Sequence, residues 1–254
     1  MTDVQVPVGR YRAALAELPL STRSVERPGG AIVVVAGDGG WVDAALDAAS
    51  AGAIAVVVAR PAFAPAADIR RIQDAVGVPV VVERPLLRPD ATGDAAAGRR
   101  SDAGWAAPRL LVADGSAARG LVPVVARDAA GWLRVLAGDD LVVAAADGEL
   151  ALLEARGGIA ATLSVVATLR SGGGSIRVRA LVEVLTEIDV DSERARVRTS
   201  TARGSVTAPD RFESSARLAV RRALAAVESE ELPDDLRALA ADTELVERVL
   251  SSAP

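Results

Sequence analysis

The chain lacks four residue types altogether: none of its 254 residues is a cysteine, histidine, lysine or asparagine. All 29 basic residues are therefore arginine. These absences exclude general-base catalysis by imidazole, Schiff-base or proton-transfer chemistry by an amine, attack by a thiolate, and metal ligation by thiolate or imidazole. The polar chemistry that remains belongs to carboxylates, hydroxyls, guanidinium groups, the backbone and the single tyrosine, Tyr11.

Aromatic residues and long apolar runs are also scarce. With three Trp, two Phe and one Tyr, the core must be built from Val, Leu, Ile and Ala. No apolar run approaches the ~20 residues of a membrane span, since the longest, Gly158–Leu169, is interrupted by Thr and Ser. The opening residues MTDVQVPVGR lack the basic-then-apolar pattern of a signal peptide. We therefore expect a cytoplasmic protein that does not contact membranes.

The overall composition is that of a globular protein. Half of the residues are apolar and a quarter are charged. The net charge of −5 and the pI near 5.0 argue against nucleic acid as a partner, because its phosphates require a basic face. The length fits one large domain or two modest ones.

The first 87 residues predict a parallel sheet. Continuous apolar runs at Ala31–Ala36, Ile54–Val58 and Val78–Val82 are typical of strands covered on both faces. Helices are predicted between them at Trp41–Ser50 and Ala66–Val76. Buried strands that alternate with helices indicate right-handed βαβ units. Ahead of them, a short Val-rich strand and a helix near residues 11–18 are expected.

The pattern changes after residue 87. Arg88–Pro108 is polar and without period, which favours a loop or linker. Pro123–Ala137 predicts an amphipathic helix that Gly138 ends. A short strand is predicted at Arg109–Val112 and a further strand at Gly158–Leu169.

The clearest pattern lies at Ser175–Asp191, which alternates with period two and predicts one long antiparallel strand with a buried face. The buried face would hold the apolar side chains Ile176, Val178, Ala180, Val182, Val184, Ile188 and Val190. Leu181 and Leu185 fall on the outer face among charges. A turn at Asp191–Glu193 then predicts a hairpin that pairs arginines with acids across the strands.

The end of the chain predicts helices. Asp210 and Glu213 are spaced as a capping box ahead of a helical stripe that runs to Val227, and a last helix is expected at Glu244–Leu250. The fold class is therefore α/β plus α+β. Residues 1–87 form a truncated Rossmann-like domain, 88–108 a linker, and 109–254 a domain with a large, mostly antiparallel sheet covered by helices.

The order of these elements resembles the glucose–fructose oxidoreductase and inositol dehydrogenase (Gfo/Idh/MocA-type) family. The resemblance covers roughly residues 31–254 and is carried by five stretches: AIVVVAGDGGWVDAALDAASAGA, IAVVVARPAFAPAADIRRIQDAVGVPVVV, RDAAGWLRVLAGDDLVVAAA, DGELALLEARGGIAATLSV and RFESSARLAVRRALAAVESEELPDDLRAL. It implies a Rossmann-like domain followed by a large sheet through which subunits pair.

The chain departs from that family at its functional positions. No G-x-G-x-x-G turn for a dinucleotide exists in the sequence. About thirty residues precede the first buried run, too few for two complete strand–helix units, and the first βαβ unit is expected to be missing. The family's catalytic lysine falls on Arg60, its histidine on Asp128, and the aspartate one turn earlier on Val124. We therefore expect no cofactor, no metal and no intact catalytic site.

Three functions remain open. The leading hypothesis is a catalytically inactive homologue that serves as a binding, assembly or regulatory protein. It would form a homo-oligomer, most simply a dimer, through the sheet face that carries Leu181 and Leu185, or would accompany a related full-length oxidoreductase. The second is a non-redox isomerase or lyase acting on a sugar-like molecule through Arg60, Asp128 or Tyr11. The third is an NAD(P)-dependent oxidoreductase with an atypical cofactor site.

Other candidate sites have simpler interpretations. Asp128 on a helix is expected to pair with Arg127 or Arg134, and Arg60 to end a buried strand. The alternating acids at 187–193 could suggest a calcium loop, but Arg194 stands where such a loop requires glycine, which favours a solvated hairpin tip. No G-x-S-x-G motif supports a serine hydrolase.

Overall fold

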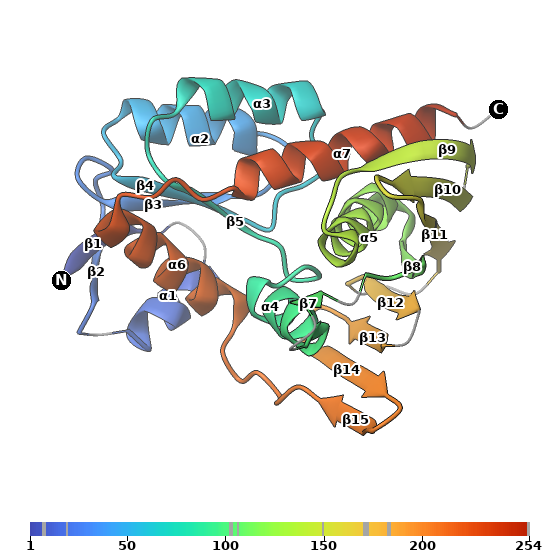
Figure 1. The fold of residues 1–254 in the computed structure, drawn as a ribbon. Helices are drawn as coiled ribbons and strands as arrows, with labels where there is room; N and C mark the ends of the chain where they lie inside the picture. The colour runs from blue at the N-terminus through green and yellow to red at the C-terminus, as the bar shows by residue number, and fades with distance from the viewer. Residues whose placement is uncertain are drawn as a thin grey trace. The chain divides into compact units, whose positions relative to one another are not determined.

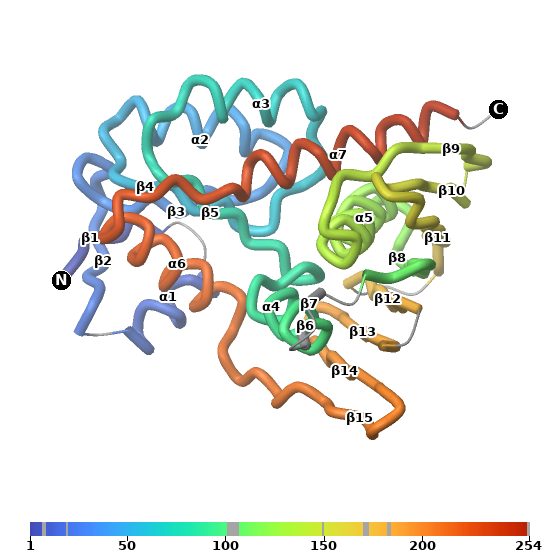
Figure 2. Tube along the Cα trace, in the orientation of Figure 1, coloured from blue at the N-terminus to red at the C-terminus, as the bar shows by residue number. Residues whose placement is uncertain are grey.

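The computed structural model describes residues 1–6, 9–18, 20–101, 104–105, 107–148, 150–169, 173–181 and 184–252. The chain forms two compact units, traced in Figure 2. The first unit comprises Met1–Arg84 and Phe212–Ala240, and the second comprises Pro85–Arg211 and Ala241–Pro254. Residues 212–240, which the sequence placed in the sheet domain, therefore pack in the first unit.

The first unit contains a parallel sheet of five strands in the order β2-β1-β3-β4-β5 (Figure 1). Its strands are β1 (Thr2–Gln5), β2 (Thr22–Val25), β3 (Ile32–Ala36), β4 (Ala55–Ala59) and β5 (Val80–Glu83). Its complete helices are α1 (Gly9–Ala16), α2 (Trp41–Ser50), α3 (Ala66–Ala75) and α6 (Ser215–Ser229). The three predicted buried strands and the two helices between them are confirmed.

Alternating side chains of these strands enter two separate cores, because a strand presents successive residues to opposite faces. One face packs against α2, α3 and the start of α7 (Asp235–Ser251), with Trp41, Ile69 and Ile72 fully buried. The other packs against α1 and α6 through residues such as Tyr11. The sheet is thus covered on both faces, as its continuous valine runs predict.

The expectation that the first βαβ unit is missing is wrong. β1 pairs in parallel with both β2 and β3, and α1 connects β1 to β2. The unit fits because α1 has eight residues and each of the two strands has four. Residues 26–31, all of which the structure describes, connect β2 to β3 without a helix.

The second unit contains an eight-stranded sheet in the order β15-β14-β13-β12-β8-β11-β10-β9. Only the β8–β11 pair in this order is parallel. The strands are β8 (Leu110–Ala118), β9 (Leu141–Asp147), β10 (Leu150–Ala155), β11 (Ile159–Thr168), β12 (Ser175–Leu181), β13 (Leu185–Val190), β14 (Ala195–Thr201) and β15 (Gly204–Thr207). The predicted fold class is confirmed.

Helices cover the inner face of this sheet. They are α4 (Pro89–Gly98), the 3-10 turn η1 (Arg119–Leu121), α5 (Val122–Ala137) and the rest of α7. Two short strands follow α4 in the chain, β6 (Arg100–Ser101) and β7 (Gly104–Trp105). α5 packs against β8, β11 and β12, as predicted for an amphipathic helix. Gly138 ends it in the left-handed conformation that glycine adopts without strain.

Residues 175–191 form a hairpin, so the prediction of one long strand is wrong. β12 and β13 pair antiparallel with Ile176 opposite Val190 and Val178 opposite Ile188. The even-numbered residues of both arms stay on the buried face, so the alternation continues through the reversal and does not reveal it. Val182 and Glu183 of the predicted strand lie outside the described residues. The second predicted hairpin, between β13 and β14, is confirmed.

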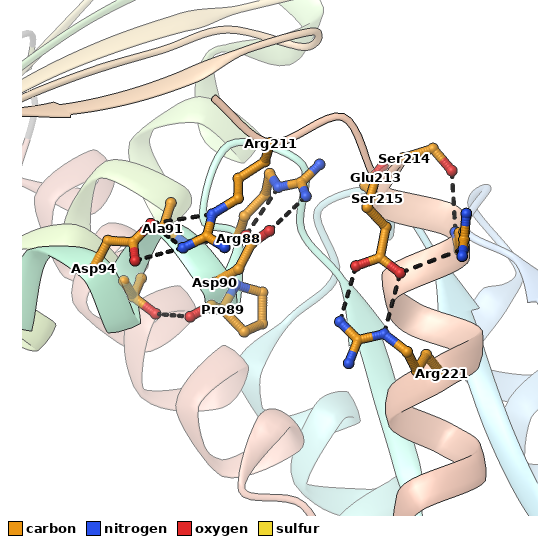
Figure 3. Close-up of polar contacts among 12 residues, drawn as sticks. Arg88, Pro89, Asp90, Ala91, Asp94, Arg211, Glu213, Ser214, Ser215 and Arg221 are labelled. Carbon is orange, nitrogen blue, oxygen red and sulfur yellow. Dashed lines mark hydrogen bonds and ion pairs between the residues drawn. The ribbon is translucent and has the colours of Figure 1, made fainter. Parts of the chain in front are cut away.

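The predicted linker contains a helix, α4, because Pro89 occupies its first turn and alanines follow. Its carboxylates hold two arginines: Arg88 bonds to Asp90, and Arg211 bonds to Asp94 (Figure 3).

The predicted capping box is wrong. Ser214 caps α6 by accepting from the backbone N–H of Arg217, while Glu213 bonds to Arg221 (Figure 3). The last helix starts at Asp235, nine residues before its predicted start at Glu244.

Two features are absent from the described part of the chain. None of its helices is long and apolar enough to cross a membrane. No group of three or more acidic, histidine or cysteine side chains within it is arranged to hold a metal ion.

Candidate functional site at the carboxyl ends of the parallel strands

The parallel sheet of the first unit directs all its carboxyl ends to one edge. Doubly wound sheets bind ligands outside that edge, at the point where the strand order reverses. Here the reversal lies at β1, which is flanked by β2 and β3. Gly37, Arg60 and Glu83 follow or end β3, β4 and β5 at this edge.

Glu83 is the centre of a polar cluster that we call the Glu83 cluster. Its side chain is 1% exposed. Oε2 accepts hydrogen bonds from the guanidinium group of Arg10 and the hydroxyl of Tyr11, both at 2.9 Å. Oε1 accepts from the hydroxyl of Ser215 at 2.6 Å and from Nε of Arg60 at 3.3 Å. One buried carboxylate thus receives four donors from α1, α6 and the end of β4.

The cluster carries a net positive charge, because two guanidinium groups surround one carboxylate. The side chains of Arg10 and Arg60 are 35% and 44% exposed, so both groups also reach solvent. The guanidinium carbon of Arg10 lies 5.5 Å from the centre of the Tyr11 ring, in the range of a cation–π contact.

Tyr11 is held in its neutral form. Burial raises the pKa of its hydroxyl, and both the charge of Glu83 and the hydrogen bond to it raise that pKa further. The phenol therefore remains protonated at neutral pH and serves as a donor to Glu83. It is not available as a general base, because a base must lose its proton near the working pH.

The ends of β3 and β4 are locked together beside this cluster. The N–H of Gly37 donates to the carbonyl of Ala59 at 3.0 Å, and the N–H of Ala62 donates to the carbonyl of Gly37 at 2.6 Å. A Cβ atom on Gly37 would collide with the backbone of Ala59 and Arg60, so only glycine fits. Arg60 itself has φ 54°, a left-handed conformation that costs energy in a residue with a side chain.

The three family positions identified from the sequence lie in different surroundings. Arg60 belongs to the first unit and bonds to Glu83. Asp128 belongs to the second unit, where its buried carboxylate accepts from Nε of Arg127 at 3.2 Å. Val124 lies half-buried in the first turn of α5. Arg134, the other arginine considered for Asp128, bonds to Asp242.

Sequence reasoning missed the centre of the site. Glu83, Arg10 and Ser215 were not singled out, although one signal was available. Glu83 directly follows three consecutive valines, Val80–Val82, of a strand predicted to be buried on both faces. A charged residue at such a position requires partners, because an isolated buried charge is too costly.

No protein-family model and no curated protein sequence matches this chain. Solved structures do resemble it. UDP-N-acetylglucosamine 3-dehydrogenase GnnA from Acidithiobacillus ferrooxidans matches with a TM-score of 0.66 and 14% identity, over 99% of this chain and 97% of that one. A dehydrogenase from Chromobacterium violaceum matches with a TM-score of 0.72 and 13% identity, over 99% and 94%.

The 3-ketoreductase KijD10 from Actinomadura kijaniata, solved with TDP-benzene and NADP, matches with a TM-score of 0.66 and 15% identity. The match covers all of this chain and 89% of KijD10. At such identities the likeness establishes the fold and not the activity. The chain has the two-part fold of the Gfo/Idh/MocA-type oxidoreductases.

Proposed function

We propose that this protein is a catalytically inactive relative of these oxidoreductases that acts as a binding, assembly or regulatory protein. One observation carries the proposal. Each of the three polar side chains that the sequence suggested for catalysis is bonded to another side chain: Tyr11 and Arg60 bond to Glu83, and Asp128 bonds to the adjacent Arg127. An arginine stays protonated and a buried, neutral tyrosine cannot accept a proton, so neither serves as a base.

The entrance to α1 supports the same proposal for the cofactor. A dinucleotide pyrophosphate binds at a helix N-terminus reached through a glycine-rich turn. In the sequence, Val6, Pro7 and Val8 stand between β1 and α1, and the single glycine nearby, Gly9, is the first residue of α1. The first helical side chains, Arg10 and Tyr11, bond to Glu83. These features favour a protein that does not hold NAD(P) in the manner of the family.

The outer face of the large sheet supports a role in assembly. Four apolar side chains on β9, β10 and β11 are 41–55% exposed, and we call them the apolar strip: Val142, Leu150, Leu152 and Val166. The sequence-based expectation of a dimer depended on Leu181 and Leu185. These side chains are half-buried, and they lie at the end of β12 and the start of β13. We propose that a second copy of this chain covers the apolar strip, since grouped exposed apolar side chains mark interaction surfaces.

Light scattering of the purified protein tests this assembly. We expect a dimer at tens of micromolar, and expect the double variant Leu150→Arg with Leu152→Arg to be monomeric, because two buried charges without partners would face each other. The single variant Leu181→Arg is the matched control and should remain dimeric. A monomeric wild-type protein would refute homo-oligomerisation. Capture of a co-expressed, catalytically competent oxidoreductase by that monomer would show a hetero-oligomer instead.

A further inference from the structure

A hollow of about 620 Å³ opens on the outer face of the large sheet, opposite the face that α5 covers. Its floor is formed by β8, β12, β13 and the start of β14, all within the second unit. We call it the sheet groove. Its polar lining side chains are Asp114, Ser116, Ser175, Arg177, Asp189, Asp191, Arg194, Arg196 and Asp210. A volume of this size lies in the range of small-molecule sites.

One row of charges crosses the floor of the groove. The strand registers align Arg196 with Asp189, Asp189 with Arg177, and Arg177 with Asp114. Asp189 bonds to Nε of Arg177 at 2.6 Å. The row ends at Arg196 on β14 and at Asp114 on β8. Neither lies within ion-pair distance of an opposite charge on a described residue. The hydrogen bond to Asp189 raises the pKa of Arg177, and the charge of Asp114 helps to raise it. The row therefore presents one cation and one carboxylate at opposite sides of the groove.

The cationic side holds a second arginine. Arg194 directly precedes β14 and lines the groove together with Arg196. Asp191 forms no ion pair with either arginine, and its Oδ1 accepts from the backbone N–H groups of Glu193 and Arg194 and closes the turn. No described carboxylate lies within ion-pair distance of the Arg194 guanidinium group. Two guanidinium groups without an ion-pair partner among the described residues suit a phosphate group, because guanidinium donors pair with phosphate oxygens.

The opposite side of the groove suits hydroxyl groups. The side-chain oxygens of Ser116 and Ser175 lie 3.0 Å apart, and each can donate or accept a hydrogen bond. The carboxylate of Asp114 can accept hydrogen bonds, as can that of Asp210, which also lines the groove. β8 and β14 are three strand spacings apart, which is about 14 Å between their backbones. The long arginine side chains shorten the span that a ligand must cover.

We propose that the sheet groove binds a phosphorylated polyhydroxyl compound, with its phosphate on Arg194 and Arg196 and its hydroxyls on Asp114, Ser116 and Ser175. A sugar phosphate and a nucleotide share this chemistry. A long polyanion does not fit, because carboxylates line the groove beside the arginines. The groove and the apolar strip occupy different strands of the outer face, β8 and β12–β14 against β9–β11.

Titration calorimetry tests the proposal with four probes: glucose 6-phosphate, AMP, glucose and inorganic phosphate. We expect saturable binding of glucose 6-phosphate or AMP, and weaker or no binding of glucose and phosphate alone. Comparing the two phosphorylated probes decides between a sugar phosphate and a nucleotide. Arg196→Ala and Asp114→Ala should each weaken binding by about tenfold or more, the usual effect of losing a hydrogen bond to a charged group.

Arg198→Ala is the matched control. Arg198 lies on the same strand and face as Arg196 but outside the groove, so its removal should leave the affinity unchanged. No saturable binding of either phosphorylated probe would overturn the proposal. Inorganic phosphate that binds as tightly as glucose 6-phosphate would also overturn the proposal, because the groove would then hold an adventitious ion only. Binding that survives Arg196→Ala unchanged would place the ligand elsewhere and also contradict the proposal.

Discussion

A single buried carboxylate determines the chemistry of the first unit. Glu83 receives four hydrogen bonds and thereby engages Arg10, Tyr11 and Arg60. Its position after three buried valines was readable from the sequence, but its partners were not. They come from positions 10, 11, 60 and 215, and no local pattern indicates which distant donors will converge on one acceptor. The sequence showed that Arg60, Val124 and Asp128 stand at the family's catalytic positions. It did not show which groups these side chains contact.

Tyr11 gives a direct optical test of the cluster, because it is the only tyrosine in the chain. Its folded pKa is raised above the ordinary value of 10.0. Its contribution to the free energy of unfolding is therefore fully present below pH 10 and is lost as the pH rises toward the folded pKa. We expect the near-ultraviolet absorbance of phenolate to stay absent above pH 10 until the protein unfolds. Reversible ionisation of Tyr11 near pH 10 in the folded protein would contradict the cluster.

Removal of the central charge should weaken the fold. Glu83→Gln leaves Arg10 and Arg60 without their carboxylate. Both guanidinium groups also reach solvent, so we expect the free energy of unfolding to fall by about 1.5–3 kcal/mol, the scale for losing a hydrogen bond to a charged group. Glu154→Gln is the matched control, because Glu154 lies exposed on β10. Urea denaturation of the three proteins measures the effect. Equal stability of both variants would show that Glu83 contributes nothing to the fold.

At the scale of elements, the sequence predicts strands and helices well where their period is unbroken. β3, β4, β5, α2 and α3 follow from apolar runs and glycine signals. The β12–β13 reversal does not, because both arms keep their apolar residues on even positions. α4 was missed since a polar, alanine-rich segment has no apolar stripe, and its helix depends on Pro89 and on arginines that bond to Asp90 and Asp94.

The turn after β3 is the element that fixes the sheet edge. Gly37→Ala should lower the free energy of unfolding by about 1–3 kcal/mol, the usual cost of forcing extra atoms into a packed site, because the new methyl group collides with the backbone of Ala59 and Arg60. Gly39→Ala, two residues on, meets no atom within 4 Å and should be neutral. Thermal unfolding of both variants tests this. Similar losses in the two variants would mean that the turn does not depend on the close approach at Gly37.

At the scale of the whole molecule, the order of elements predicted the fold class, and comparison with solved structures confirms it. The division into units was harder to predict. Residues 212–240 return to the first unit, and the sequence gives no signal for that return because α6 is amphipathic in either location. The sheet groove could not be predicted from the sequence either, because its charge pattern depends on which arginine bonds to Asp189.

We propose that this protein neither holds a dinucleotide nor transfers hydride. Titration calorimetry with NAD and NADP at millimolar concentration tests this, with KijD10, which was solved with NADP, as the positive control. We expect no saturable heat for this protein, because Arg10 and Tyr11 at the start of α1 are bound to Glu83 and no glycine-rich turn precedes them. Saturable binding of either nucleotide with a dissociation constant in the low micromolar range would contradict the claim.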